Sequence, residues 1–180
     1  MMKFLRLLPL FFLGPTLCSA QSIPAVKAKA LNDSEVALPN PSSGQVLILI
    51  VGFSHKSADV IESWAKHLAA DYHDNPRVAY FAMPELQGVP GLVKPMILHG
   101  MRKDVSSAEY PHFVPIYDNK PAWEKLVSFA APDDAYLIVA TPDGHPVWQS
   151  HGAYSDETYG ELKKSVSAFL GEAPTSVSKP

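Results

Sequence analysis

One apolar run limits the possible folds of this chain more than any other feature of its sequence. Val46 to Val51 contains six consecutive valine, leucine or isoleucine residues. A strand with one solvated face alternates polar and apolar residues, and this run has no polar position. It therefore predicts a strand covered on both faces, at the centre of an α/β sheet. The 180 residues leave room for one ordinary domain.

The residues after this strand have helical spacing. Ser57 stands where an N-cap is expected, Asp59 falls in the first turn, and apolar residues then recur over 60–72. A second apolar run, Val78 to Met83, follows the helix-ending pair Asn75-Pro76. This order predicts a β-α-β unit, whose right-handed crossover makes the two strands parallel.

The second half of the chain predicts further strands and helices. In order, we expect a helix over 89–103 broken or kinked at Pro95, a strand over 113–117, a helix over 121–129, a hairpin of strands 135–140 and 146–150, and a helix over 155–170. The apolar face expected for the last helix consists of Leu162, Val166, Phe169 and Leu170. Together these elements predict a mixed sheet with helices on both faces.

The first twenty residues predict a secretory signal peptide. Lys3 and Arg6 precede the apolar run Leu7–Leu13, and small residues follow at 18–20. We expect cleavage after Ala20, export to a bacterial periplasm or secretion, and no transmembrane segment in the mature chain. An uncleaved anchor and a lipid on Cys18 are the alternatives. An anchor would also leave the rest of the chain outside, because the positive charges precede it.

The remaining chain divides into three parts. Residues 21–44 have no clean period and form a connecting segment, with a short strand expected near Glu35 to Leu38. Residues 45–171 form the domain. Residues 172–180 are rich in proline, serine and lysine and predict a flexible tail.

Cysteine content and charge exclude several functions. Cys18 is the only cysteine in the sequence, so cleavage after Ala20 leaves no thiol. Disulfide exchange and cysteine peroxidase chemistry need a thiolate and are then excluded. The formal net charge of −3 argues against a nucleic-acid-binding protein. The seven histidines are scattered without a His-x-x-x-His pair, so we predict no metal site and no cofactor.

The order of the elements resembles the thioredoxin-like arrangement. In redox-active members a buried strand ends in an aromatic residue and runs into Cys-x-x-Cys at the start of the first helix. Here the strand ends in Gly52-Phe53, and Ser54-His55-Lys56-Ser57 stands in the place of that motif. The resemblance implies an α/β fold with a thioredoxin-like mixed central sheet. The cis-proline of that superfamily would fall near Ala135, and Pro132 lies three residues earlier.

A closer resemblance is to the ATPase complex subunit 10 family, mitochondrial assembly chaperones for ATP synthase. The matching features, in chain order, are Phe53, Ser63-Trp64, the segments 99–105 and 136–139, Asp143-Gly144 and the segment 147–153. The resemblance implies a chaperone or assembly factor whose partner is a protein, here of a membrane complex.

These observations predict a binding protein without redox activity and without catalytic residues. The candidate partner-binding residues are those in the place of the thiol motif, with a neighbouring proline and an aromatic in the hairpin: Phe53, Ser54, His55, Lys56, Ser57, Pro132 and Trp148. We expect the segment 131–135 to lie beside the first five. The alternative is a hydrolytic or metal-dependent enzyme of unknown substrate that uses Ser54-His55-Lys56-Ser57.

Overall fold

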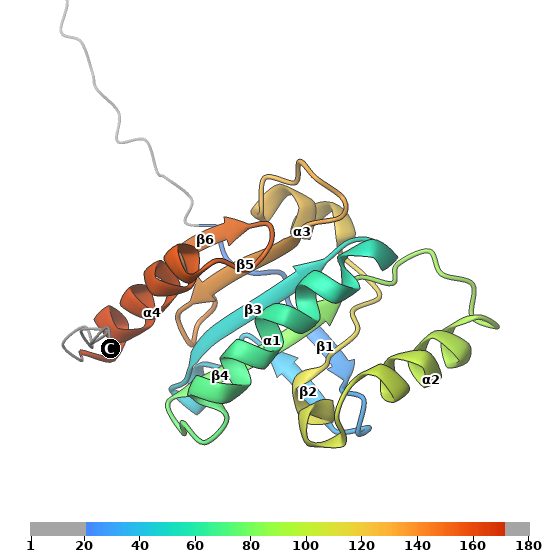
Figure 1. Ribbon diagram of the computed structural model, residues 1–180, viewed down its shortest axis with the longest axis horizontal. Helices are drawn as coiled ribbons and strands as arrows, with labels where there is room; N and C mark the ends of the chain where they lie inside the picture. The colour runs from blue at the N-terminus through green and yellow to red at the C-terminus, as the bar shows by residue number, and fades with distance from the viewer. Residues whose placement is uncertain (1–20, 172–180) are drawn as a thin grey trace, which may run out of the picture.

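Four strands form the central sheet, in the spatial order β4-β3-β5-β6 (Figure 1). The computed structural model describes residues 21–171. The strands are β3 (Val46–Gly52), β4 (Val78–Pro84), β5 (Ala135–Ala140) and β6 (Pro146–His151). β3 runs parallel to β4 and antiparallel to β5, and β5 and β6 form an antiparallel hairpin. The sheet is mixed, and the four strands lie where the sequence predicted them.

β3 is buried along its whole length, as its composition predicted. Successive side chains of a strand point to opposite faces of the sheet. Ile48 and Ile50 accordingly pack in the core on one face, and Leu47 and Leu49 pack in the core on the other. The apolar run therefore joins two separate hydrophobic layers.

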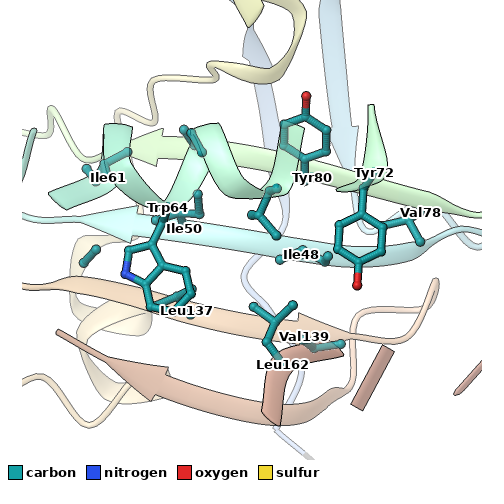
Figure 2. Packing of buried hydrophobic residues seen from close by; sticks show 14 of the residues in the cluster. Ile48, Ile50, Ile61, Trp64, Tyr72, Val78, Tyr80, Leu137, Val139 and Leu162 are labelled. Atoms are coloured by element: carbon teal, nitrogen blue, oxygen red, sulfur yellow. The ribbon is translucent and has the colours of Figure 1, made fainter. Parts of the chain in front are cut away.

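Helices α1 (Ala58–Tyr72) and α4 (Asp156–Leu170) cover the first face of the sheet (Figure 1). Figure 2 shows Trp64 of α1 and Leu162 of α4 among the side chains that fill this layer. The indole Nε1 of Trp64 donates a hydrogen bond of 3.0 Å to the carbonyl of Gly152. This bond ties α1 to the turn that follows β6.

Helix α3 (Lys120–Leu126) and a hairpin of β1 (Val26–Lys29) and β2 (Glu35–Leu38) pack in the layer on the second face. β2 was expected from the sequence, whereas β1 was not. The segment before β1 is held to the domain because the Ile23 amide donates to the Gly144 carbonyl at 2.9 Å. The predicted signal peptide and tail lie outside the described residues.

Helix α2 (Lys94–Asp104) lies at the edge of the molecule (Figure 1) and has no fully buried residue. The predicted break at Pro95 is wrong. Pro95 lies in the first turn of α2, where backbone N–H groups have no partner within the helix, so the proline costs no helical hydrogen bond. The helix therefore begins at this point and does not kink. Arg102 holds the C-terminal end of α2 in place, because its Nε donates a hydrogen bond of 2.7 Å to the Leu31 carbonyl.

Three other expectations are corrected. Residues 113–117 form no strand but only isolated parallel bridges beside β4. The Val114 and Ile116 amides donate to the Ala82 and Pro84 carbonyls, and Pro84 has no N–H with which to continue the ladder between them. Helix α3 ends at Leu126 instead of 129, and Ser128 adopts a left-handed φ of 51°. Phe169 of α4 is exposed, and Tyr159 takes a place in the buried face.

Candidate partner-binding corner

The candidate site lies where β3 ends and α1 begins. We call the segments 53–57 and 131–136 together the corner. Between β3 and α1, residues His55–Ser57 form one turn of 3₁₀ helix. At Gly52 the two elements approach so closely that a Cβ atom would overlap Ser57 Oγ and Ile61 Cδ1. Only glycine lets β3 run this close to the start of the helix.

Ser54 is the cap of this turn. Its backbone is extended, and its Oγ accepts hydrogen bonds from the amides of Lys56 at 3.1 Å and Ser57 at 3.3 Å. The same Oγ donates a hydrogen bond of 2.9 Å to Oδ1 of Asp133. Ser54 therefore holds both the start of the helix and the loop before β5.

The predicted cap, Ser57, has a different role. Ser57 is fully buried and its Oγ donates to the Ser54 carbonyl at 2.8 Å. It makes no side-chain cap bond to α1. A 3₁₀ turn precedes the α-helix, so the capping position moves to Ser54.

Two consecutive aspartates fasten the loop before β5. Lys56 Nζ lies 3.6 Å from Oδ2 of Asp133, with both side chains largely exposed. On the other side, Nδ1 of His151 in β6 lies 2.7 Å from Oδ2 of Asp134. The loop is therefore joined to the start of α1 by one aspartate and to the sheet edge by the next.

Three aromatic rings, those of Phe53, Phe129 and Tyr136, pack against one another at the corner. Phe53 contacts Phe129 and Tyr136 edge to face, with ring centroids 5.0 and 5.5 Å apart. The Tyr136 hydroxyl accepts hydrogen bonds from the Ala130 and Ala131 amides, at 2.9 and 2.8 Å, and donates to the Ala131 carbonyl at 3.0 Å. These bonds fix the backbone of the two residues directly before Pro132 and Asp133.

The structure brings together most of the candidate residues. Segments 53–57 and 131–135 are in contact through Asp133, with His55 and Pro132 exposed on the surface. Trp148 does not join them. It pairs with Val139 in the middle of β6 and packs, half-buried, against the α1 and α4 side of the sheet.

No cis-proline precedes β5. Within residues 21–171 the one cis peptide bond is Leu38–Pro39, so the bond before Pro132 is trans. Asp133 and Asp134 occupy the two positions directly before the strand.

Four residues that build or support the corner were not singled out from the sequence: Phe129, Asp133, Asp134 and Tyr136. Of these, Asp133 and Asp134 lie within the expected segment 131–135. Two consecutive aspartates directly before an apolar strand were a usable signal of a structured loop, because two adjacent carboxylates favour hydrogen-bond donors or cations close by. Nothing in the local sequence indicates that the donor to Asp133 is Ser54, since 79 positions separate them.

The chemistry available at the corner is limited. A nucleophilic serine needs a base that takes its proton and a group that orients the base. Ser54 donates to a carboxylate, which is a weaker base than the imidazole of a Ser-His-Asp triad, and in the described part of the chain His55 makes no side-chain hydrogen bond. Nor does any set of three or more His, Cys, Asp or Glu side chains among residues 21–171 have the placement to hold a metal ion.

Comparison with known proteins identifies the fold. No protein-family model matches the chain, and no curated protein matches it in sequence. Among solved structures, an uncharacterized conserved protein from Geobacillus kaustophilus has a TM-score of 0.57 at 15% identity, over 89% of this chain and 87% of its own.

Two further structures carry functional descriptions. The pneumococcal exposed lipoprotein thioredoxin Etrx1 from Streptococcus pneumoniae has a TM-score of 0.52 at 10% identity, over 79% of this chain and 98% of its own. BsSco, a member of the Sco family of cytochrome c oxidase assembly proteins, has a TM-score of 0.51 at 12% identity, over 83% and 95%. The thioredoxin-like fold is thus confirmed. The likeness to the ATPase complex subunit 10 family stays a sequence resemblance.

Proposed function

We propose that this protein binds another protein through the corner and acts, without redox chemistry, as a chaperone or assembly factor outside the cytoplasm. The observation that carries the proposal is the hydrogen bond from Ser54 to Asp133. It uses the position of a catalytic thiol to hold two chain segments together. A site arranged in this way supports binding and not bond exchange.

Rigidity is the physical reason that the corner suits binding. An interface whose side chains are already fixed loses less conformational entropy when a partner arrives. Ser54, Asp133 and Tyr136 fix the backbone of both segments before any partner is present. The exposed groups above them include an imidazole, an ammonium and a carboxylate, from His55, Lys56 and Asp133. Such groups set partner specificity through charge more than they set affinity.

Location and partner class rest on separate arguments. The sequence of residues 1–20 has the pattern of an export signal, and one structural neighbour is an exposed lipoprotein. Within residues 21–171 no helix has the length and apolar character that crossing a bilayer requires. BsSco, a structural neighbour, belongs to a family of cytochrome c oxidase assembly proteins, which supports the proposal of an assembly role, although fold alone does not determine function.

The test is capture of partners with a corner variant and a matched control. Ser54→Trp places a bulky ring on the corner, and Ser107→Trp makes the same change at an exposed 3₁₀ position that touches no corner residue. Each tagged protein is captured from its native membranes, and co-purifying proteins are quantified by mass spectrometry. Circular dichroism confirms that both variants keep the fold.

We expect one set of partners to be retained by the wild type and by Ser107→Trp and depleted at least tenfold by Ser54→Trp. Subunits of ATP synthase in that set would support the assembly role that the sequence resemblance implies. Equal recovery by all three proteins would reject the corner as the binding site. Labelling of Ser54 by a serine-directed probe would favour the hydrolytic alternative instead.

A further inference from the structure

A groove separates the β1–β2 hairpin from α2. Its volume is about 890 Å³, within the range of sites that hold a ligand. The hairpin contributes the continuous stretches 27–31 and 35–37, and the other wall is formed by Leu98, Arg102 and Tyr117. None of these residues belongs to the corner, so the groove is a second, separate surface.

One wall of the groove is an unpaired strand edge. β1 pairs with β2 alone in a two-stranded sheet, and β1 is the strand of the hairpin nearer α2 (Figure 1). In an antiparallel pair, alternate residues direct their N–H and C=O groups away from the partner strand. Within the described residues, no backbone hydrogen bond outside this hairpin involves residues 26–29. The edge is therefore open to another extended chain.

The opposite wall of the groove presents two apolar side chains, and Arg102 closes one end of the groove. Leu98 of α2 and Tyr117 are both half-buried and present carbon surface to the groove. At the hairpin turn Arg102 bridges the two walls, through its bond to the Leu31 carbonyl and a contact of 3.4 Å with Oδ1 of Asp33. A chain that enters would lie between a strand edge and a helix, as in strand-addition complexes.

The charges along the open length are basic. Lys27 and Lys29 are exposed, and their spacing of two puts them on the same side of β1. In the described part of the chain neither lysine forms an ion pair. Of the two acids in the lining, Asp33 is paired with Arg102, and Glu35 lies opposite Lys29 at the closed end. The free charge therefore favours carboxylates.

We propose that this groove binds an extended acidic peptide segment, which adds as a further strand to the outer edge of β1. Its backbone pairs with β1, its carboxylates face Lys27 and Lys29, and its alternate apolar side chains contact Leu98 and Tyr117. The inference goes beyond the proposed function, because it does not depend on the corner.

The probe is a fluorescein-labelled, end-capped hexapeptide of alternating Glu and Val, measured by fluorescence anisotropy at low salt. Two matched peptides accompany it, one with Lys in place of every Glu and one N-methylated at alternate residues. N-methylation removes strand-pairing donors without changing the side chains. We expect the Glu peptide to bind at least tenfold more tightly than either matched peptide.

Three protein variants complete the test. Lys27→Glu/Lys29→Glu should weaken binding of the Glu peptide at least tenfold. Lys125→Glu/Lys164→Glu, an equal charge change at exposed positions of α3 and α4, should change it less than threefold. Ser54→Trp should leave it unchanged.

Three outcomes overturn the proposal. Equal affinity for the N-methylated peptide would mean charge attraction without strand pairing. Equal weakening by the two lysine pairs would mean that the groove is not the site. Loss of binding in Ser54→Trp would place the peptide at the corner, which would reject the groove and leave the proposed function standing.

Discussion

Ser54 and Asp133 are 79 positions apart in the sequence, and their side chains meet in a hydrogen bond of 2.9 Å. This bond, with the ion pair between Lys56 and Asp133 at 3.6 Å, joins the start of α1 to the loop before β5. In redox-active proteins with the thioredoxin-like fold, a cysteine stands at the place of Ser54. Here Ser54 instead joins the two segments of the corner through its bond to Asp133.

The first prediction concerns this pair. Ser54→Ala removes a helix cap and one partner of Asp133, so we expect a loss of about 1–2 kcal/mol in the free energy of unfolding. Asp133→Ala should cost less, about 0.5 kcal/mol, because its side chain is 51% exposed. In a double-mutant cycle measured by urea unfolding, the coupling should be about 0.5 kcal/mol. Additive effects would mean that the hydrogen bond contributes nothing to stability.

The second prediction concerns Gly52. A Cβ atom there would overlap Ser57 Oγ and Ile61 Cδ1, so Gly52→Ala should destabilise the protein by about 1–3 kcal/mol. Gly160 in α4 has open space around its Cα, and Gly160→Ala should stabilise by about 0.5–1 kcal/mol. Thermal unfolding of the two variants checks both signs. A neutral Gly52→Ala would show that α1 can shift away from β3 at no cost.

The third prediction compares two buried tryptophans. Trp64 and Trp123 are both 0% exposed, but Trp64 Nε1 donates to Gly152, whereas Trp123 Nε1 has no partner within the described residues. Trp64→Phe leaves the Gly152 carbonyl unpaired, and Trp123→Phe relieves an unpaired donor. We expect Trp64→Phe to cost about 1–2 kcal/mol more in urea unfolding. The reverse order would contradict the hydrogen-bond assignment.

The fourth prediction concerns alkaline pH. Burial, followed by hydrogen bonds to Glu109 and Asp71, raises the pKa of Tyr80 and of Tyr159 above the ordinary value. The folded protein keeps both phenols neutral, while the unfolded chain ionises them above about pH 10. Their contribution to stability is therefore complete below pH 10 and is lost as the pH rises, by about 1.4 kcal/mol per pH unit for each tyrosine.

Urea unfolding between pH 8 and 11 measures this loss. Tyr80→Phe/Tyr159→Phe is less stable at pH 8, because Glu109 and Asp71 lose their phenol partners, but its stability should fall less steeply above pH 10. Equal slopes for the wild type and the double variant would refute the assignment of these two phenols.

The sequence predicted the elements whose signals are local. The run Val46–Val51 has no polar position, so two-sided burial followed from composition alone. The helix expected over 155–170 is α4, and Ser155 caps it through its bond to the Thr158 amide. Pro95 was misjudged because the same residue breaks a helix in its interior and begins one at its first turn. Only the position where α2 starts decides between these outcomes.

The arrangement of the candidate corner was predictable only in part, for a similar reason. Segment 53–57 was found because it follows the central strand and matches the place of a known motif. The role of Ser54 depends on Asp133, and that of Asp134 depends on His151 of β6. These pairs exist only after the sheet has formed, so they depend on tertiary structure and leave no pattern along the chain.

The position of Asp133 makes the corner a poor place for a reactive thiol. If Ser54→Cys and Ser57→Cys introduced two sulfurs, the first would stand beside the Asp133 carboxylate, which disfavours a thiolate and raises the pKa of the thiol. The second would be sealed in the interior at the position of the fully buried Ser57. The two substitutions would create a Cys-x-x-Cys motif without its usual reactivity. A reactive thiol pair would need a change at position 133 as well, and that change would remove the hydrogen bond that joins the two segments of the corner.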